Sequence, residues 1–293
     1  MKFKSIGPVM STKIAEILRG STTTISGWAD KIESICLLTQ SEKQILHRNL
    51  KFQKLHKGQR AFIIANGPSI ANQELSHLKS EITFGSSGFY KHEIVNVWQP
   101  TYYSIIDPLF FNDPKIFIPF FRELNSKVSQ STFFLTLTRG YSANMKYNLL
   151  PTNKTFYSSS YGSSNTRQLD ITNVTFGFQN VSAFSLGLAV YMECNPIYLI
   201  GFDHDYLVER GISRHFYQGC ILGGELKEIH ENKPISEIYS YYETMKFMQK
   251  FWENYMALDK IAKLKGIKIF NATDGGYLDV FERINYNEIE FEK

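Results

Sequence analysis

The chain has 293 residues, of which 43% are hydrophobic and 20% charged, and its net charge is +4. This length and composition predict a globular protein with a sizeable core and exclude an intrinsically disordered chain. The charge is too mild for a nucleic-acid-binding protein, the three cysteines are too scattered for a zinc site or a disulfide framework, and no apolar run reaches the 18 residues of a membrane span.

Residues 1–58 are expected to form an N-terminal helical segment. Ser11 can cap a short helix over 12–18, and apolar residues recur at helical spacing over 26–55. The other side of this second helix is basic, with Lys43, Arg48, Lys51, Lys54 and Lys57. A solvated surface is the common role of such a face, and peripheral contact with the inner membrane surface is the alternative.

Residues 59–293 alternate between short apolar strands and helices. We expect strands at 62–65, 81–85, 101–106, 132–137, 155–158, 196–201 and 267–270, and helices at 70–78, 115–127, 182–193 and 236–265. This alternation predicts an α/β fold with a Rossmann-like, mostly parallel sheet and helices on both faces. Its ligand is expected at the carboxyl ends of the strands, and the irregular stretch over about 202–235 is long enough to be a lid.

The first strand ends in the turn Asn66-Gly67-Pro68-Ser69. Ser69 is suited to cap the following short helix, whose first amides would face the turn. A strand, a tight turn and a helix N-terminus together predict an anion site, although an ordinary turn is the alternative. The turn lacks the lysine of a Walker loop and the glycines of a dinucleotide fingerprint.

Further polar residues follow the other predicted strands: Ser86 and Ser87, Asp107, Asp203-His204-Asp205-Tyr206, and Asn271 with Thr273. Two carboxylates beside a histidine are suited to bind a divalent cation or to tune the imidazole for proton transfer. The alternative is that Asp203 caps the loop and His204 is structural. Within the expected lid, His215 is followed by Phe216 and Tyr217, and a solvated loop histidine is the alternative there.

Five stretches resemble one known group of proteins. They are the strand and turn over 62–69, Thr83-Phe84-Gly85, Tyr102-Tyr103-Ser104-Ile105-Ile106-Asp107-Pro108, the helix and strand over 182–206 that include Gly201-Phe202-Asp203, and the last strand region over 267–278. In this order they resemble the DUF115 group, which includes the motility accessory factor (Maf) glycosyltransferases and archaeal hydroxymethylpterin pyrophosphokinase-like (MptE-like) proteins. The chain is also similar to the bacterial sialyltransferases of family GT42, over about 60–281.

The resemblance to the sialyltransferases implies a GT-A-variant nucleotide fold, a CMP-activated nonulosonic sugar as donor, catalysis without a metal, and a histidine base. It gives Asn66 a nucleotide contact and makes Tyr206 the nearest counterpart of a tyrosine that holds the leaving phosphate. A second nucleotide-binding asparagine of the family corresponds here to Ser87. The family's histidine has no clean match, and His215 is the closest substitute.

We therefore expect a cytoplasmic glycosyltransferase that acts on a glycan or lipid-linked acceptor, with no cofactor, no metal and no nucleic-acid partner. The nucleotide contacts would come from Asn66, Gly67, Pro68, Ser69, Ser87, Asp107 and Tyr206. Asp203, Asp205 and Tyr217 would orient the substrate, and His215, or His204 as second choice, would be the base. The first alternative is an ATP-dependent pterin pyrophosphokinase with magnesium on Asp107, Asp203 and Asp205. The second is a non-catalytic nucleotide-binding module. Oligomerisation is left open.

Overall fold

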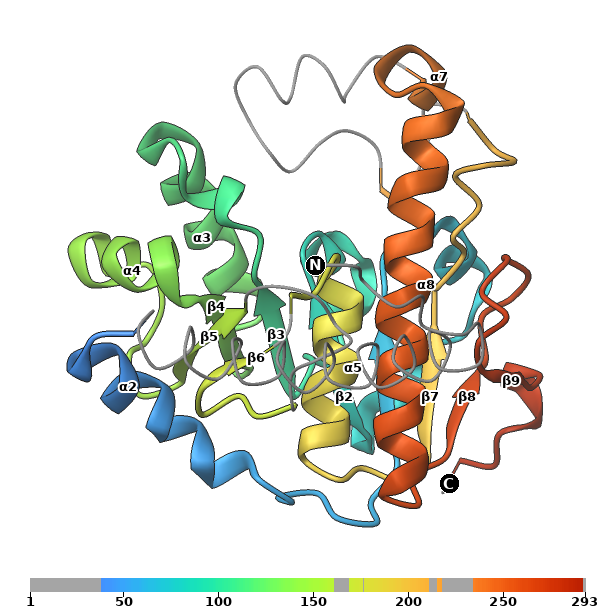
Figure 1. Ribbon diagram of the computed structural model, residues 1–293, viewed down its shortest axis with the longest axis horizontal. Coiled ribbons are helices and arrows are strands. Elements are labelled where there is room, and N and C mark those ends of the chain that lie inside the picture. The colour runs from blue at the N-terminus through green and yellow to red at the C-terminus, as the bar shows by residue number, and fades with distance from the viewer. Residues whose placement is uncertain (1–37, 161–168, 176, 211–214, 218–233, 292–293) are drawn as a thin grey trace, which may run out of the picture.

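The computed structural model describes residues 38–160, 169–175, 177–210, 215–217 and 234–291 (Figure 1). The helix predicted over 12–18 lies outside these ranges, as do residues 26–37 of the second helix and residues 211–214 and 218–233 of the expected lid. Within the described ranges, no helix combines the length and the apolar character needed to cross a membrane.

Nine strands of the described chain form one sheet, and every strand pair in it is parallel. The order across the sheet is β6-β5-β4-β3-β2-β1-β7-β8-β9. The strands are β1 (Ala61–Ile64), β2 (Ile82–Ser86), β3 (Tyr102–Ile105), β4 (Thr132–Thr136), β5 (Thr155–Ser160), β6 (Val174–Thr175), β7 (Ile197–Ile200), β8 (Ile269–Asn271) and β9 (Glu282–Arg283). The predicted Rossmann-like parallel sheet is confirmed, and the two-residue strands β6 and β9 were not predicted because they carry too little pattern.

Helices cover both faces of this sheet, as predicted. Residues of β1 alternate between two apolar cores, with Phe62 and Ile64 in one and Ala61 and Ile63 in the other. The first core contains the apolar side of α3 (Pro114–Lys127), and the second contains α5 (Val181–Tyr191) and one side of α8 (Tyr241–Leu264). Figure 1 shows α5 and α8 side by side against the sheet. A strand buried on both faces explains the uninterrupted apolar run over 61–65.

Several helices differ from the sequence-based expectation. The helix expected over 70–78 is replaced by two 3-10 helices, η2 and η3, and α8 begins at Tyr241, because Ser240 and Glu243 form a capping box there. A separate turn of helix, α7, precedes it. The remaining helices are η2 (Pro68–Asn72), η3 (Ser76–Ser80), η4 (Phe89–Lys91), η5 (Glu93–Asn96), η6 (Pro108–Phe111), the π-helix η7 (Leu137–Tyr141), α4 (Ser142–Tyr147), α7 (Ile235–Ile238) and η8 (Tyr286–Glu288).

The N-terminal segment packs against the α/β domain. Its α-helix, α2 (Gln40–His47), ends earlier than expected and continues as the 3-10 helix η1 (Arg48–Phe52). Asn49 is fully buried and donates from Nδ2 to two backbone carbonyl oxygens, those of Tyr157 at 2.8 Å and Ile171 at 2.7 Å. The basic face is partly engaged, since Lys51 lies over the Phe156 ring.

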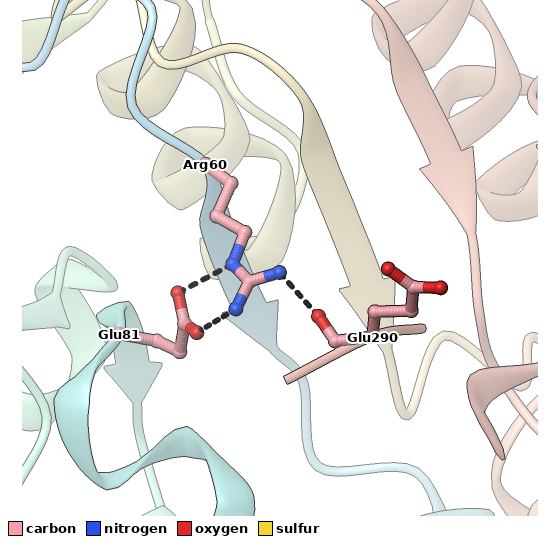
Figure 2. A network of polar contacts seen from close by, with 3 residues as sticks. All are labelled: Arg60, Glu81 and Glu290. Atoms are coloured by element: carbon pink, nitrogen blue, oxygen red, sulfur yellow. Dashed lines mark hydrogen bonds and ion pairs between the residues drawn. The ribbon is translucent and has the colours of Figure 1, made fainter. Parts of the chain in front are cut away.

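The two ends of the α/β domain are joined by Arg60, at the start of β1. Its guanidinium pairs with both carboxylate oxygens of Glu81 and donates to the backbone carbonyl of Glu290 at 2.6 Å (Figure 2). The side chains of Arg60 and Glu81 are 26% and 12% exposed, so the pair is shielded from most solvent. This network fixes the C-terminal segment beside the first strands.

Candidate functional site

The predicted site residues come together where β1 lies between β2 and β7. The strands that follow β1 in sequence, β2 to β6, lie on one side of it, and β7 to β9 lie on the other side. The order of the strands across the sheet therefore reverses at β1. In open α/β sheets, ligands bind outside the carboxyl ends of strands at such a reversal. Asn66, Ser86 and Asp203 end or directly follow these three strands.

Asp203 and Ser69 lock the turn after β1 to the end of β7. The backbone N–H of Ser69 donates to Asp203 Oδ1 at 3.0 Å, and the Ser69 hydroxyl donates to Oδ2 at 2.8 Å. Asp203 is only 8% exposed, and burial raises the pKa of its carboxyl despite these bonds. A Cβ on Gly67 would lie 2.5 Å from both Asp203 Cγ and the Gly201 carbonyl oxygen, so the close approach requires glycine.

These contacts correct the expectation for the turn. Gly67, not Ser69, is the N-cap of η2, because the Ser69 hydroxyl is turned to Asp203. The Gly67 amide donates to the Gly201 carbonyl at 3.0 Å, and Pro68 has no amide hydrogen. The donors that were predicted to hold a phosphate are thus engaged by groups of the protein itself.

The loop after β8 supports Asp203 from the other side. The backbone N–H of Tyr277 donates to the Asp203 carbonyl at 2.8 Å, and a Cβ on Gly276 would lie 2.7 Å from that same oxygen. The Thr273 hydroxyl accepts from the backbone N–H of Phe202 at 3.0 Å. Thr273 was among the predicted polar strand ends, whereas Gly276 carries no signal that would have placed it at Asp203.

Asn66 presents a hydrogen-bond acceptor at the same edge. Its Nδ2 donates to the Ser86 carbonyl at 3.1 Å, which fixes the orientation of the amide. The residue is 7% exposed, and its Oδ1 is buried without a hydrogen-bond partner in the described part of the chain. A buried unpaired oxygen costs about 1–3 kcal/mol, so this atom is poised for a donor group.

His215, Phe216 and Tyr217 lie against this turn. The backbone N–H of Phe216 donates to the Asn66 carbonyl at 3.1 Å, and the His215 ring stacks on Tyr217 with centroids 5.0 Å apart. The Tyr217 ring covers Gly88 so closely that a Cβ there would collide with it. The segment predicted to carry the base is therefore beside the turn predicted to bind the nucleotide.

His204 lies in a different environment. It adopts φ +48°, and its Nε2 is 2.9 Å from the hydroxyl of Tyr255. Burial lowers the pKa of the imidazole to about 4, so at neutral pH it is an uncharged ring and a weaker base than predicted. Tyr206 lies beside it, with ring centroids 6.3 Å apart. Sequence reasoning missed Tyr255, because its position on the apolar side of α8 reads as core.

Asp107 lies far from the other predicted carboxylates. It follows β3, which is three strands away from the β7 strand that precedes Asp203 and Asp205. Neighbouring strands are about 4.8 Å apart, so these strand ends are about 14 Å apart. Mg²⁺ ligands lie about 2.1 Å from the ion, so this spacing of the strands disfavours one ion held by Asp107 together with Asp203. The described residues contain no group of three histidines, cysteines or acids placed to hold a metal.

Solved structures of similar fold include glycosyltransferases, all at low identity. The Maf glycosyltransferase from Magnetospirillum magneticum AMB-1 has a TM-score of 0.48 and 15% identity, covering 98% of this chain. This chain spans only 43% of that protein. The sialyltransferase CstII from Campylobacter jejuni with cytidine-5'-monophosphate has a TM-score of 0.46 and 14% identity, covering 81% of this chain and 90% of that one. The α-2,3-sialyltransferase Cst-I from Campylobacter jejuni has a TM-score of 0.45 and 16% identity, covering 75% of this chain and 77% of that one.

At these identities and TM-scores the likeness carries no information on function. A search of curated proteins finds no match. A family model, in contrast, matches residues 38–209, which is more than half of the chain and includes α2, the turn after β1 and the cluster over 203–206. The resemblance inferred from the short motifs is thereby confirmed: the chain belongs to the 6-hydroxymethylpterin diphosphokinase MptE-like family.

Proposed function

We propose that this chain is a glycosyltransferase that moves a sialic-type nonulosonic sugar from a CMP donor to a hydroxyl of a glycan or lipid-linked acceptor. The observation that carries the proposal is the buried, unpaired Asn66 Oδ1 at the switch point of the sheet. The backbone carbonyl of the same residue accepts from the N–H of Phe216, the neighbour of His215 in sequence. An unpaired oxygen alone would not suffice, because Asn49 Oδ1 is also unpaired. Asn66 combines it with an amide whose orientation is fixed by Ser86 and with a place at the carboxyl edge, next to the segment that carries His215.

The chemistry of this oxygen selects which part of a nucleotide it contacts. Oδ1 accepts hydrogen bonds and cannot donate them, so it fits the amino group of cytosine or a ribose hydroxyl. A phosphate that is ionised at neutral pH offers only acceptors. We therefore assign the nucleoside end of the donor to Asn66, with Ser87 beside it, and assign Gly67 and Ser69 to holding the turn.

His215 is assigned the general base. It would take the proton of the acceptor hydroxyl while that oxygen forms a bond to the anomeric carbon. The bond from this carbon to the phosphate oxygen breaks, and CMP leaves with its electron pair. A histidine has the side-chain pKa closest to neutral pH. Tyr206 is proposed to hold the leaving phosphate, Asp107 to contact the nucleotide, and Asp205 and Tyr217 to orient the substrate.

Binding of CMP to an Asn66→Ala variant tests the nucleotide contact. Loss of one buried hydrogen bond costs about 1–3 kcal/mol, which raises the Kd of CMP about 5- to 150-fold in calorimetry. The matched control is Asn49→Ala, which removes a buried asparagine with two backbone contacts elsewhere in the fold. It should lower the melting temperature without changing the Kd. Equal CMP affinity in wild type and Asn66→Ala would remove Asn66 from the site.

Turnover of a CMP-activated nonulosonic acid tests the base. His215→Ala should reduce kcat by about 10²–10⁴-fold and leave the Kd of CMP nearly unchanged. A variant that keeps more than about a tenth of wild-type turnover would exclude His215 as the base.

An ATP- and magnesium-dependent pyrophosphokinase that acts on a pterin alcohol is the second candidate. It is favoured by the name of the matching family, 6-hydroxymethylpterin diphosphokinase MptE-like. Pyrophosphoryl transfer from ATP should stop in the presence of a chelator, whereas the proposed sugar transfer should continue. Binding of CMP without turnover of any donor would instead indicate a non-catalytic module. The scattered cysteines support the cytoplasm as the compartment for either reaction.

A further inference from the structure

His204 is a buried polar group that the proposed reaction does not use. It directly follows Asp203 at the carboxyl end of β7, and the residue as a whole is half-buried while its Nδ1 is fully buried. Five aromatic rings surround it at centroid distances of 5.3–6.3 Å, namely those of Phe202, Tyr206, Phe251, Trp252 and Tyr255. Aromatic faces around a polar centre are typical of sites that hold an uncharged ligand of mixed polarity.

A chain of hydrogen bonds favours one tautomer of this histidine. Asn180 Oδ1 accepts from the backbone N–H of Ala183 at 2.7 Å, so its Nδ2 is the atom that donates to the Tyr255 hydroxyl at 3.1 Å. Tyr255 has one proton to donate. His204 Nε2 is at 2.9 Å and Asn180 Oδ1 at 3.4 Å, so the shorter contact favours a proton that points to His204. Because Nε2 accepts, the hydrogen of the uncharged ring is on Nδ1.

The Nδ1–H group then lacks a partner. Nδ1 is buried without a hydrogen-bond partner among the described residues. Of the rings around His204, those of Tyr206 and Trp252 belong to partly exposed residues, so we place the ligand on their side of the imidazole. Such a ligand has to supply an acceptor atom.

The charges around His204 decide which acceptor fits. Asp203 and Asp205 flank it in sequence, and burial raises the pKa of both carboxyls. An ionised carboxyl on either side repels a phosphate or carboxylate that would bind at Nδ1 itself. An uncharged carbonyl oxygen is not repelled, and it can only accept a hydrogen bond. Sugar rings commonly carry such a carbonyl in an acylamino group, and their C–H faces stack on aromatic rings.

We propose that His204 is a specificity-determining residue whose Nδ1–H binds the carbonyl oxygen of an acylamino sugar. This inference rests on the proposed function, since it assigns a sugar to the same carboxyl edge. The acylamino group belongs either to the transferred sugar or to the acceptor sugar. Tyr255 and Asn180 act as positioning residues, because they hold the tautomer and do not touch the ligand.

Two substitutions distinguish the roles of the two ring nitrogens of His204. The amide nitrogen of Asn takes the place of Nδ1, so His204→Asn keeps the proposed donor, and Asn tolerates the positive φ of this position. The amide of Gln reaches the place of Nε2, so His204→Gln keeps the contact to Tyr255 and loses the donor to the ligand. Melting temperatures of both variants report whether each is folded.

The test measures substrate preference in two arms. In the donor arm, kcat/KM is compared for CMP-activated nonulosonic acids with an acetamido group or a hydroxyl at the same carbon. In the acceptor arm, kcat/KM is compared for an N-acetylgalactosaminide and a galactoside. Wild type should prefer the acetamido substrate at least about 10-fold in one arm, and that arm identifies the sugar. His204→Asn should keep most of this preference, and His204→Gln should lose it.

The outcomes separate this inference from the proposed function. Transfer without an acetamido preference in either arm, or a preference that survives in His204→Gln, overturns the inference and leaves the glycosyltransferase standing. Absence of transfer with every donor overturns the proposed function, and the inference with it. Long-range ¹H–¹⁵N NMR of the free protein tests the tautomer by itself: a proton on Nε2 refutes the first step, and Tyr255→Phe should lose the Nδ1–H tautomer preference.

Discussion

Gly67→Ala is the most direct test of the lock between the turn after β1 and the end of β7. Gly67 has φ −63° and ψ 156°, which any residue adopts without strain, so the cost of alanine here is purely steric. The new Cβ would lie 2.5 Å from Asp203 Cγ and from the Gly201 carbonyl oxygen, and closer still to Asp203 Oδ2. Ordinary contact needs about 3.5 Å, so the carboxylate has to move by more than an ångström.

Such a shift breaks both hydrogen bonds between Ser69 and Asp203, which are 3.0 and 2.8 Å long. A hydrogen bond to a charged group contributes about 1.5–3 kcal/mol, so the free energy of unfolding should fall by about 3–6 kcal/mol. For a chain of this size, a loss of 1 kcal/mol lowers the melting temperature by about 2–3 °C. The melting temperature of the variant should therefore be about 6–18 °C lower in a calorimetric scan.

Gly58→Ala is the matched control. Gly58 has φ +76° and no atom within 4 Å of a new Cβ, so alanine there meets backbone strain without a clash and should cost about 1–2 kcal/mol. In an Asp203→Ala background, Gly67→Ala should cost less than in wild type, because two of its three close contacts are with that side chain. A Gly67→Ala protein within about 1 kcal/mol of wild type would refute the lock.

Two further predictions concern charged groups. Asp203→Asn keeps the shape of the side chain and removes a carboxyl whose pKa is raised in the folded state. Because of this group, wild type loses stability as the pH rises above 3.8, and the variant does not. The melting temperature of the variant relative to wild type should therefore be higher at pH 7 than near pH 3.8; the opposite trend would contradict the raised pKa. Arg60→Met leaves the Glu81 carboxylate unpaired at 12% exposure and should cost about 1–3 kcal/mol in urea unfolding, most of it recovered by adding Glu81→Gln. No recovery in the double variant would mean that the arginine acts through Glu290 instead.

The sheet could be predicted from the sequence because its central strands are buried on both faces. An apolar run such as 61–65, bounded by a charged residue and a glycine turn, has one common explanation in an α/β chain. The strand ends then fix which loops share an edge, and that placed Asn66, Ser86 and Asp203 together. The short strands β6 and β9 have no such run, and their pairing depends on neighbours far away in sequence.

The details of the site could not be predicted, because they depend on which polar groups satisfy one another. The turn after β1 reads as an anion site, yet its donors face Asp203, a residue more than 130 positions later. From the sequence, His204 is predicted to be a base. The structure places Tyr255, 51 residues later in the chain, against its Nε2. Sequence patterns locate the ends of elements, whereas these contacts follow from tertiary packing.

The strand order also has a consequence for synthesis of the chain. β1 pairs on one side with β2, the next strand in sequence, and on the other side with β7, so that Ile64 and its partner Ile200 are more than 130 residues apart. At roughly 5–20 residues per second, a ribosome needs about 7–27 s to deliver that partner. During this time one edge of an apolar strand has no neighbour and can pair with another chain. Weaker induction, which leaves fewer unfinished chains present at one time, should therefore increase the yield of protein that folds without aggregates.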